Sequence, residues 1–217
     1  MILMTLNFEE TISEERLEQG RSLYDLLNEL DREEKNAIIG FRCVSKDLPD
    51  SLDNDDLEWI EFKTSLEVLT EMGVCFINEE DLRSLLDEFQ NNAGNIYSDH
   101  RAWSILTVLE LDDHMNFDSS YLEANIYDNG SKLNPIAIDL VGKSDYLHIA
   151  TCKFNITTQR ESALDKAEEL RSVSDDIEEE CVICLGTLSI QYKERIEAQV
   201  GAKFDEIVSG VDILDLE

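Results

Sequence analysis

The first 90 residues of the chain carry hydrophobic side chains at helical spacing. In residues 13–30 apolar positions recur every three or four residues, and Ser13 is suited to cap a first turn that contains acidic residues. Residues 55–73, which end in a glycine, and residues 78–89 repeat the pattern. This spacing predicts three helices, each with one apolar face directed at a core.

Two shorter apolar segments lie between these helices. Residues 36–44 and residues 73–77 are β-prone, and they favour a hairpin beside the helices. We therefore expect residues 1–95 to form a small helical domain, which is winged-helix-like if the hairpin forms. The polar segment 91–100, which contains a glycine, is the expected joint to a second domain over residues 98–217.

The second region alternates between helical and strand patterns. Its helices are predicted from a period of about 3.6 residues, and its strands from alternating or continuous apolar runs bounded by turns. In chain order the segments are a helix at 98–111, strands at 121–128, 136–142 and 146–154, a helix at 158–173, a strand at 180–188, a helix at 189–201 and a strand at 204–214. This order predicts an α/β chain (α+β overall) with a mixed sheet flanked by helices.

Polar residues stand out in two of these strands. The strands at 136–142 and 146–154 are joined by a short turn, which predicts an antiparallel hairpin. Because side chains alternate along a strand, Thr151 and Lys153 share one face of the second strand. Across a short hairpin, Asp139 of the first strand is expected beside Lys153.

Asp139 and the tripeptide at residues 151–153 (Thr-Cys-Lys) resemble the motif of the restriction-endonuclease-like superfamily, also called PD-(D/E)xK nucleases. That superfamily has an Asp at the end of the second strand of a meander and an acid-x-Lys on the third. The resemblance covers residues 98–217 and implies a nuclease that hydrolyses phosphodiesters with Mg²⁺ or Mn²⁺. It implies that Asp139 binds the metal ion and Lys153 positions the attacking water. Thr151 replaces the expected second acid, and a hydroxyl cannot replace a carboxylate as a ligand for a hard dication.

Other carboxylates can complete such a site, and each has a second interpretation. The first helix of the superfamily often supplies a Glu, and Glu110 is the nearest candidate. Some family members carry Ser or Thr at the acid position and take a carboxylate from the following helix, where Glu161 and Glu168 are the candidates here. Glu161 also fits a capping box that begins at Thr158, and Glu168 also fits a solvent-facing helix surface. The expected catalytic residues are Asp139, Lys153, Glu110 and Glu168, with Asp139 and Glu168 as metal ligands.

The chain is strongly acidic, with 49 Asp and Glu, 18 Lys and Arg, and a formal net charge of −31. The excess is even, at −16 in residues 1–97 and −15 in residues 98–217. Halophilic adaptation to a high-salt cytoplasm, ordinary acidity and mimicry of nucleic acid all explain it. Residues 132–171 are an exception, with six acids and six bases. This balance suits a polyanion site, and ordinary pairing on helix surfaces gives the same balance.

The cysteines point to a reducing environment. They are five in number and mostly lie in apolar segments, which favours thiols over a disulfide framework. The segment from Cys181 to Cys184 has CxxC spacing, but on a strand these two side chains point to opposite faces and do not form a zinc pair. The chain has neither a run of about 18 apolar residues nor a signal peptide, which favours a soluble, cytoplasmic protein without a membrane partner.

Two classes of function follow from these features. A restriction-endonuclease-like protein of nucleic-acid processing or genome defence binds DNA or RNA, and it cuts only if its degenerate site is active. A non-catalytic acidic interaction module, or a DNA-mimic inhibitor, binds a basic protein partner instead. A homodimer is compatible with both classes.

Overall fold

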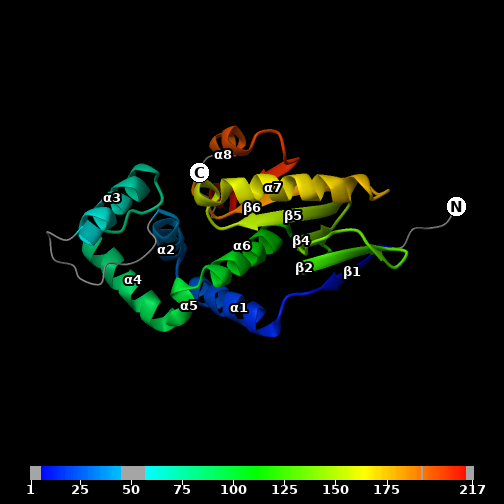
Figure 1. Cartoon of the computed structure of the whole chain (residues 1–217). Helices are drawn as coiled ribbons and strands as arrows, with labels where there is room; N and C mark the ends of the chain where they lie inside the picture. Colours follow the sequence, from blue (N-terminus) through cyan, green and yellow to red (C-terminus); the bar gives the residue numbers. More distant parts are fainter. Residues whose placement is uncertain (1–5, 45–56, 192, 214–217) are drawn as a thin grey trace.

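The structure is a computed structural model that describes residues 6–44, 57–191 and 193–213 (Figure 1). Its helices are α1 (Glu14–Asn28), α2 (Arg32–Val44), α3 (Leu57–Glu71), α4 (Glu79–Ala93), α5 (Asn95–Ser98), α6 (His100–Met115), α7 (Ile156–Asp175), α8 (Lys193–Val200) and α9 (Gly210–Ile213). Its strands are β1 (Leu6–Glu10), β2 (Ser119–Asp128), β3 (Ser131–Lys132), β4 (Ile138–Lys143), β5 (Leu147–Lys153), β6 (Cys181–Thr187) and β7 (Glu206–Val208). No helix in these described ranges is long and apolar enough to cross a membrane.

The strands form one mixed sheet in the order β1-β2-β4-β5-β6-β7, and the short β3 pairs with β2. β2, β4 and β5 form an antiparallel meander, whereas β5, β6 and β7 run parallel. Parallel neighbours need a crossover connection, and α7 supplies it between β5 and β6. The predicted mixed sheet flanked by helices is confirmed.

Helices cover both faces of this sheet (Figure 1). α7 packs on one face, where Ala163 and Ala167 lie in a buried cluster with Ile149 of β5. α6 packs on the opposite face, where Leu111 lies in a separate cluster with Leu140 of β4. The sheet therefore separates two apolar layers, as expected for strands that are buried on both faces.

α6 is buried on several sides because it lies between the sheet and the N-terminal helices. Its fully buried Trp103 belongs to the cluster formed mainly by α1, α2 and α4. Along α1, Gly20 faces Ile105 of α6 so closely that a Cβ atom at Gly20 would overlap the isoleucine side chain. Ser13 caps α1 by accepting a hydrogen bond from the backbone N–H of Arg16, which confirms the predicted helix start.

The hairpin predicted for the N-terminal region is wrong. Residues 36–44 belong to the helix α2, in which Asn36–Arg42 are all buried. A short, continuously apolar segment fits a buried helix as well as a strand, so periodicity alone could not separate the two. Residues 73–77 form an irregular connection. Between residues 11 and 118, the described chain contains helices and loops only, so the region is helical without a wing.

β1 is a strand in a part of the chain, before residue 13, for which the sequence pattern predicts no element. It pairs antiparallel with β2 at the edge of the sheet, and Leu6 and Phe8 pack against the α7-side cluster. Two inward apolar residues in a five-residue strand are a weak signal, which explains why the pattern missed it. The N-terminal and C-terminal regions therefore share a sheet as well as the contact between α1 and α6.

Candidate functional site

The β4–β5 hairpin brings Asp139 and Lys153 together. The two strands pair antiparallel, and Leu140 is the partner of Ala150. Continuing this register by one residue places Asp139 opposite Thr151. Lys153 Nζ lies 4.0 Å from Asp139 Oδ2. The predicted hairpin and the predicted proximity of the aspartate and the lysine are confirmed.

Asp139 lies near the beginning of β4, not at the end of the strand as the resemblance implies. It is the second residue of β4, and Lys153 is the last residue of β5. Because the strands are antiparallel, the beginning of one lies beside the end of the other. The pair is therefore at one edge of the sheet, where β5 leads into α7.

One oxygen of Asp139 accepts bonds from the position where the motif has an acid. Thr151 Oγ1 donates a hydrogen bond of 2.8 Å to Asp139 Oδ2, and the backbone N–H of Cys152 donates another of 2.8 Å to the same oxygen. The Thr151 side chain is fully buried. Burial, followed by the Asp139 charge, raises the pKa of the Cys152 thiol well above its usual value, so this thiol stays neutral.

A second carboxylate, that of Glu123, lines the same site from β2. The register of β2 and β4 sets Glu123 opposite Asp139, between two paired positions. Its φ of 44° is in the left-handed region, which costs a non-glycine residue about 1 kcal/mol. Arg16 of α1 binds both carboxylate oxygens, with Nη2–Oε1 at 2.6 Å and Nη1–Oε2 at 2.8 Å. Two parallel bonds of this kind neutralise Glu123 and fix its orientation.

A cavity of about 130 Å³ lies between these groups. It is lined by residues of α1, α6, the three meander strands and α7, namely Arg16, Ser104, Ile105, Val108, Glu123, Asp139, Cys152, Lys153 and Gln159. Two cations and two carboxylates therefore meet at this cavity, so its formal charge is balanced within a chain of net charge −31.

A larger pocket of about 350 Å³ adjoins this cavity and shares Ser104 and Gln159 with it. Its main charged group is Arg42 of α2, which is only 5% exposed. The guanidinium carbon lies 5.6 Å from the ring centre of Trp103 and 5.8 Å from that of Phe154, so the cation packs against two aromatic rings.

Arg42 has spare hydrogen-bonding capacity. Its Nη2 lies 3.4 Å from His100 Nδ1, and its buried Nε has no hydrogen-bond partner. None of the ion pairs found among the described residues includes Arg42. A buried cation without a carboxylate partner is costly, and an anionic ligand in the pocket would offset that cost.

The N-terminus of α7 borders the same pocket. Asn155 is the N-cap, and its Oδ1 accepts a hydrogen bond from the backbone N–H of Thr157. The predicted capping box from Thr158 to Glu161 is therefore wrong, because the helix starts two residues earlier than Thr158. Gln159 Oε1 accepts a hydrogen bond from the backbone N–H of Asn155. In a capping box this bond from a helix side chain back to the N-cap N–H was expected from Glu161.

Glu110, a predicted catalytic residue, is bound elsewhere. It is buried on α6 and forms an ion pair of 2.8 Å with Lys35 of α2. Burial raises its pKa, and the hydrogen bond and charge of Lys35 lower it in part. Its carboxylate does not line the Asp139 cavity. Hydrophobic periodicity cannot predict the partner of Glu110, because α6 is buried on several sides. For such a helix, the pattern does not show toward which neighbour a polar side chain points.

Glu168, predicted as a catalytic residue and a metal ligand, also lies away from the cavity. Its side chain is 73% exposed on α7 and lies 3.5 Å from Lys203. The buried face of α7 is formed by other residues, including Ala163, Ala167 and Leu170. The alternative interpretation, a solvent-facing helix surface, fits its position.

Comparisons with known proteins give little help. No family model matches the chain, and no curated protein matches it. Among solved structures, the crystal structure of protein VC1899 from Vibrio cholerae matches with a TM-score of 0.33 and 14% identity, over 97% of this chain and 56% of that chain. The chain spans about half the length of that protein. A likeness at this level carries no argument about function.

Proposed function

We propose that this chain is a restriction-endonuclease-like protein of nucleic-acid processing or genome defence that binds phosphodiester groups without cleaving them. The observation that carries the proposal is the hydrogen bond from Thr151 to Asp139, because it occupies the position where a cleaving enzyme needs a second carboxylate. The site is thereby closed by internal hydrogen bonds around a retained Asp139–Lys153 pair.

The order of elements supports the superfamily part of this proposal. A helix (α6), an antiparallel meander (β2, β4, β5), a crossover helix (α7) and a parallel strand (β6) follow one another in the chain. The resemblance implies this same order, with the aspartate and the lysine on the second and third strands of the meander. Fold similarity alone does not fix function, so the argument about activity rests on the site.

The donor set does not fit Mg²⁺ or Mn²⁺, the ions that the resemblance implies. These hard cations bind carboxylate oxygens, and a two-carboxylate site would need Glu123 beside Asp139. Both oxygens of Glu123 are bound by Arg16, and Oδ2 of Asp139 accepts two hydrogen bonds. A dication would have to displace these cationic and N–H or O–H donors, so the proposal includes no step through a metal ion.

The groups that remain suit a phosphate. Arg42 is buried beside the pocket without a carboxylate partner, and Lys153 lies at the adjoining cavity. The first turn of α7 also borders the pocket, and its backbone N–H groups add a partial positive charge. A kink at Gln159 (φ −115°, ψ 17°) separates this turn from the rest of the helix. Residues 132–171, which include Lys153 and α7 up to Arg171, are the part of the sequence where acids and bases balance.

The test is nucleic-acid binding by the whole chain, measured by fluorescence polarisation with labelled single-stranded DNA, RNA and duplex DNA. We expect binding that weakens as salt rises, and a loss of at least about tenfold in affinity for Arg42→Met, which keeps an apolar side chain but removes the charge. Arg101→Met, at an exposed arginine of α6, is the matched control and should bind as the wild type does.

The same samples, incubated with Mn²⁺ and run on denaturing gels, test the absence of cleavage. We expect intact substrate at low and at high salt. Cleavage that disappears in Asp139→Ala would contradict the proposal, because a contaminating nuclease would not respond to that change. Absence of binding, or equal binding by Arg42→Met and Arg101→Met, would favour the alternative function, an acidic module or DNA mimic that binds a basic protein.

A further inference from the structure

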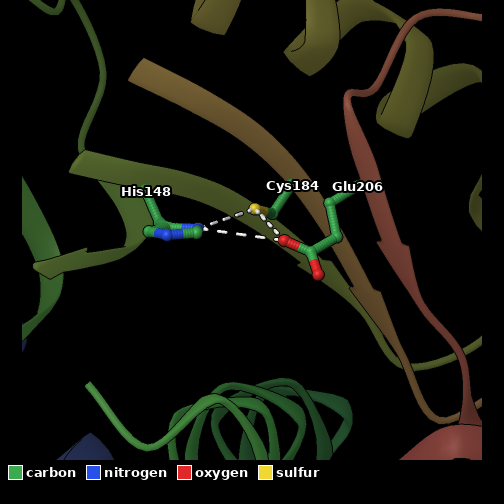
Figure 2. Close-up of side chains that lie close together, drawn as sticks. All are labelled: His148, Cys184 and Glu206. Atoms are coloured by element: carbon green, nitrogen blue, oxygen red, sulfur yellow. Dashed lines mark hydrogen bonds and ion pairs between the residues drawn. The ribbon is translucent and has the colours of Figure 1, made fainter. Parts of the chain in front are cut away.

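Three side chains with metal-binding atoms meet on neighbouring parallel strands (Figure 2). They are His148 on β5, Cys184 on β6 and Glu206 on β7. Cys184 and Glu206 are direct partners across β6 and β7, and Ala150 is the partner of Cys184 on β5, so His148 is a diagonal neighbour. The sheet register therefore brings together three residues that are far apart in sequence.

The distances between the three donor atoms match those around one zinc ion. His148 Nδ1 lies 3.6 Å from Cys184 Sγ, Cys184 Sγ lies 3.8 Å from Glu206 Oε2, and His148 Nδ1 lies 3.9 Å from Glu206 Oε2. Tetrahedral zinc with ordinary bond lengths separates such donor atoms by about 3.4–3.6 Å. The two distances to Cys184 Sγ lie within a few tenths of an ångström of these values, and the distance from His148 Nδ1 to Glu206 Oε2 would have to shorten by about 0.5 Å.

Direct contacts among these groups explain the arrangement less well. The contacts of Cys184 Sγ with His148 Nδ1 and Glu206 Oε2 are hydrogen bonds of a weak kind, because a thiol is a weak donor (Figure 2). The separation of 3.9 Å between His148 Nδ1 and Glu206 Oε2 is too long for a hydrogen bond. The three atoms instead surround a common point at nearly equal distances from one another. An ion at that point would satisfy all three.

The surroundings of His148 hold Nδ1 toward the other two residues. Its other ring nitrogen, Nε2, lies 3.4 Å from Ser144 Oγ, an outer-shell contact of the kind that fixes the orientation of metal-binding histidines. The Phe117 ring packs 5.1 Å from the imidazole, centre to centre. His148 and Cys184 are buried, while the Glu206 side chain is 38% exposed and leaves a route for an ion from solvent.

We propose that His148, Cys184 and Glu206 form a Zn²⁺ site with three protein ligands and a fourth position open to water. Nitrogen, sulfur and oxygen donors together suit zinc and other transition metals, and a thiolate does not suit Mg²⁺ or Ca²⁺. His148 lies five positions before Lys153 on β5, about 16 Å along a strand, whereas Ala150, the partner of Cys184, lies two positions before Cys152, which lines the Asp139 cavity. The two proposed sites share no side chain, and neither proposal depends on the other.

The experiment uses the whole chain after treatment with a chelator. Zinc affinity is measured by competition with a chromophoric chelator, and Co²⁺ is bound in place of zinc to record its absorption spectrum. We expect one ion per chain and a sulfur-to-cobalt charge-transfer band in the near ultraviolet. Cys184→Ser should abolish that band, and Glu206→Gln, at a side chain that is 38% exposed, should weaken zinc binding by at least about tenfold.

Cys181→Ser is the matched control, because Cys181 lies on the same strand and packs in the cluster on the α7 face. It should retain the wild-type affinity and the charge-transfer band. The proposal is overturned if the wild type binds less than one equivalent of zinc. It is equally overturned if bound Co²⁺ shows no thiolate band, or if Glu206→Gln and Cys181→Ser bind zinc equally tightly.

Discussion

Glu110 shows how a single buried charge depends on one partner. Its carboxylate is 5% exposed, and Lys35 from α2 supplies both an ion pair and a hydrogen bond to it. Breaking a buried pair by removing one member leaves an uncompensated charge, whereas removing both members costs much less. The Lys35–Glu110 pair therefore joins α2 to α6 only as long as both side chains are present.

Lys35→Met should lower the free energy of unfolding by about 2–4 kcal/mol near neutral pH. Burial raises the pKa of Glu110 above its ordinary value of 4.5, and Lys35 is the main group that lowers it, so the replacement raises it further. When the pKa of an acid is higher in the folded state than in the unfolded state, the protonated acid stabilises the folded state. This contribution is complete below the pKa of the unfolded state, and it is lost as pH rises through the pKa of the folded state. The difference from the wild type should thus shrink as pH falls toward 4.5.

Urea unfolding of both proteins across this pH range measures the difference. The double variant Lys35→Met/Glu110→Gln is the control, since without the buried charge it should recover part of the loss at neutral pH. A difference that does not vary with pH would contradict a charge-based explanation.

Gly20 is the residue on which the packing of α1 against α6 depends. Helix propensity alone favours Ala over Gly in a helix interior by about 1 kcal/mol. At this position the added Cβ would overlap the side chain of Ile105, so the two helices would have to separate. Close helix packing therefore explains a glycine that helix propensity does not.

Gly20→Ala should destabilise the protein by about 1–3 kcal/mol, against the direction that helix propensity predicts. Thermal unfolding followed by circular dichroism measures the change. Arg21→Ala, at an exposed position of the same helix, should stay within about 0.5 kcal/mol of the wild type. Ile105→Ala removes the Cγ2 atom that the new Cβ would overlap, so Gly20→Ala/Ile105→Ala should cost less than the sum of the two single substitutions. An unchanged or higher melting temperature in Gly20→Ala would show that α1 does not pack this closely.

The elements that the sequence predicts well are those with a strong local signal. The strands at 136–142 and 146–154 have turn residues between them and alternating or apolar patterns, and they appear as β4 and β5. The segment 36–44 has an equally apolar pattern but becomes the buried helix α2, because tertiary burial and not local pattern decides such a segment. β1 is too short to carry a signal of its own.

Of the candidate site, only the contact within the β4–β5 hairpin could be predicted from the sequence. Asp139 and Lys153 are close in sequence, so local pairing was enough to bring them together. Arg16 and Glu123 are separated by 107 residues, and the sequence gives no signal for their pairing. The cluster of His148, Cys184 and Glu206 likewise depends on the register of parallel strands, which a single sequence does not reveal.

At the scale of the whole molecule, the N-terminal segment is built into the sheet of the C-terminal region. β1 pairs with β2, and α1 contributes Arg16 to the cavity beside Asp139. The net charge of −31 surrounds this assembly, and its self-repulsion is screened strongly at about 1 M salt, where the Debye length is about 3 Å. The proposed phosphodiester site therefore depends on both regions and on ionic conditions.

The central claim is that Thr151 and Arg16 close the Asp139 site against a divalent metal ion. Crystals soaked in Mn²⁺ and measured at the manganese absorption edge test it directly. The account predicts no anomalous peak at Asp139, with Thr151 Oγ1 still donating to Asp139 Oδ2 and Arg16 still bound to Glu123. A manganese peak at metal–ligand distance from an Asp139 oxygen, about 2.0–2.6 Å, would contradict it.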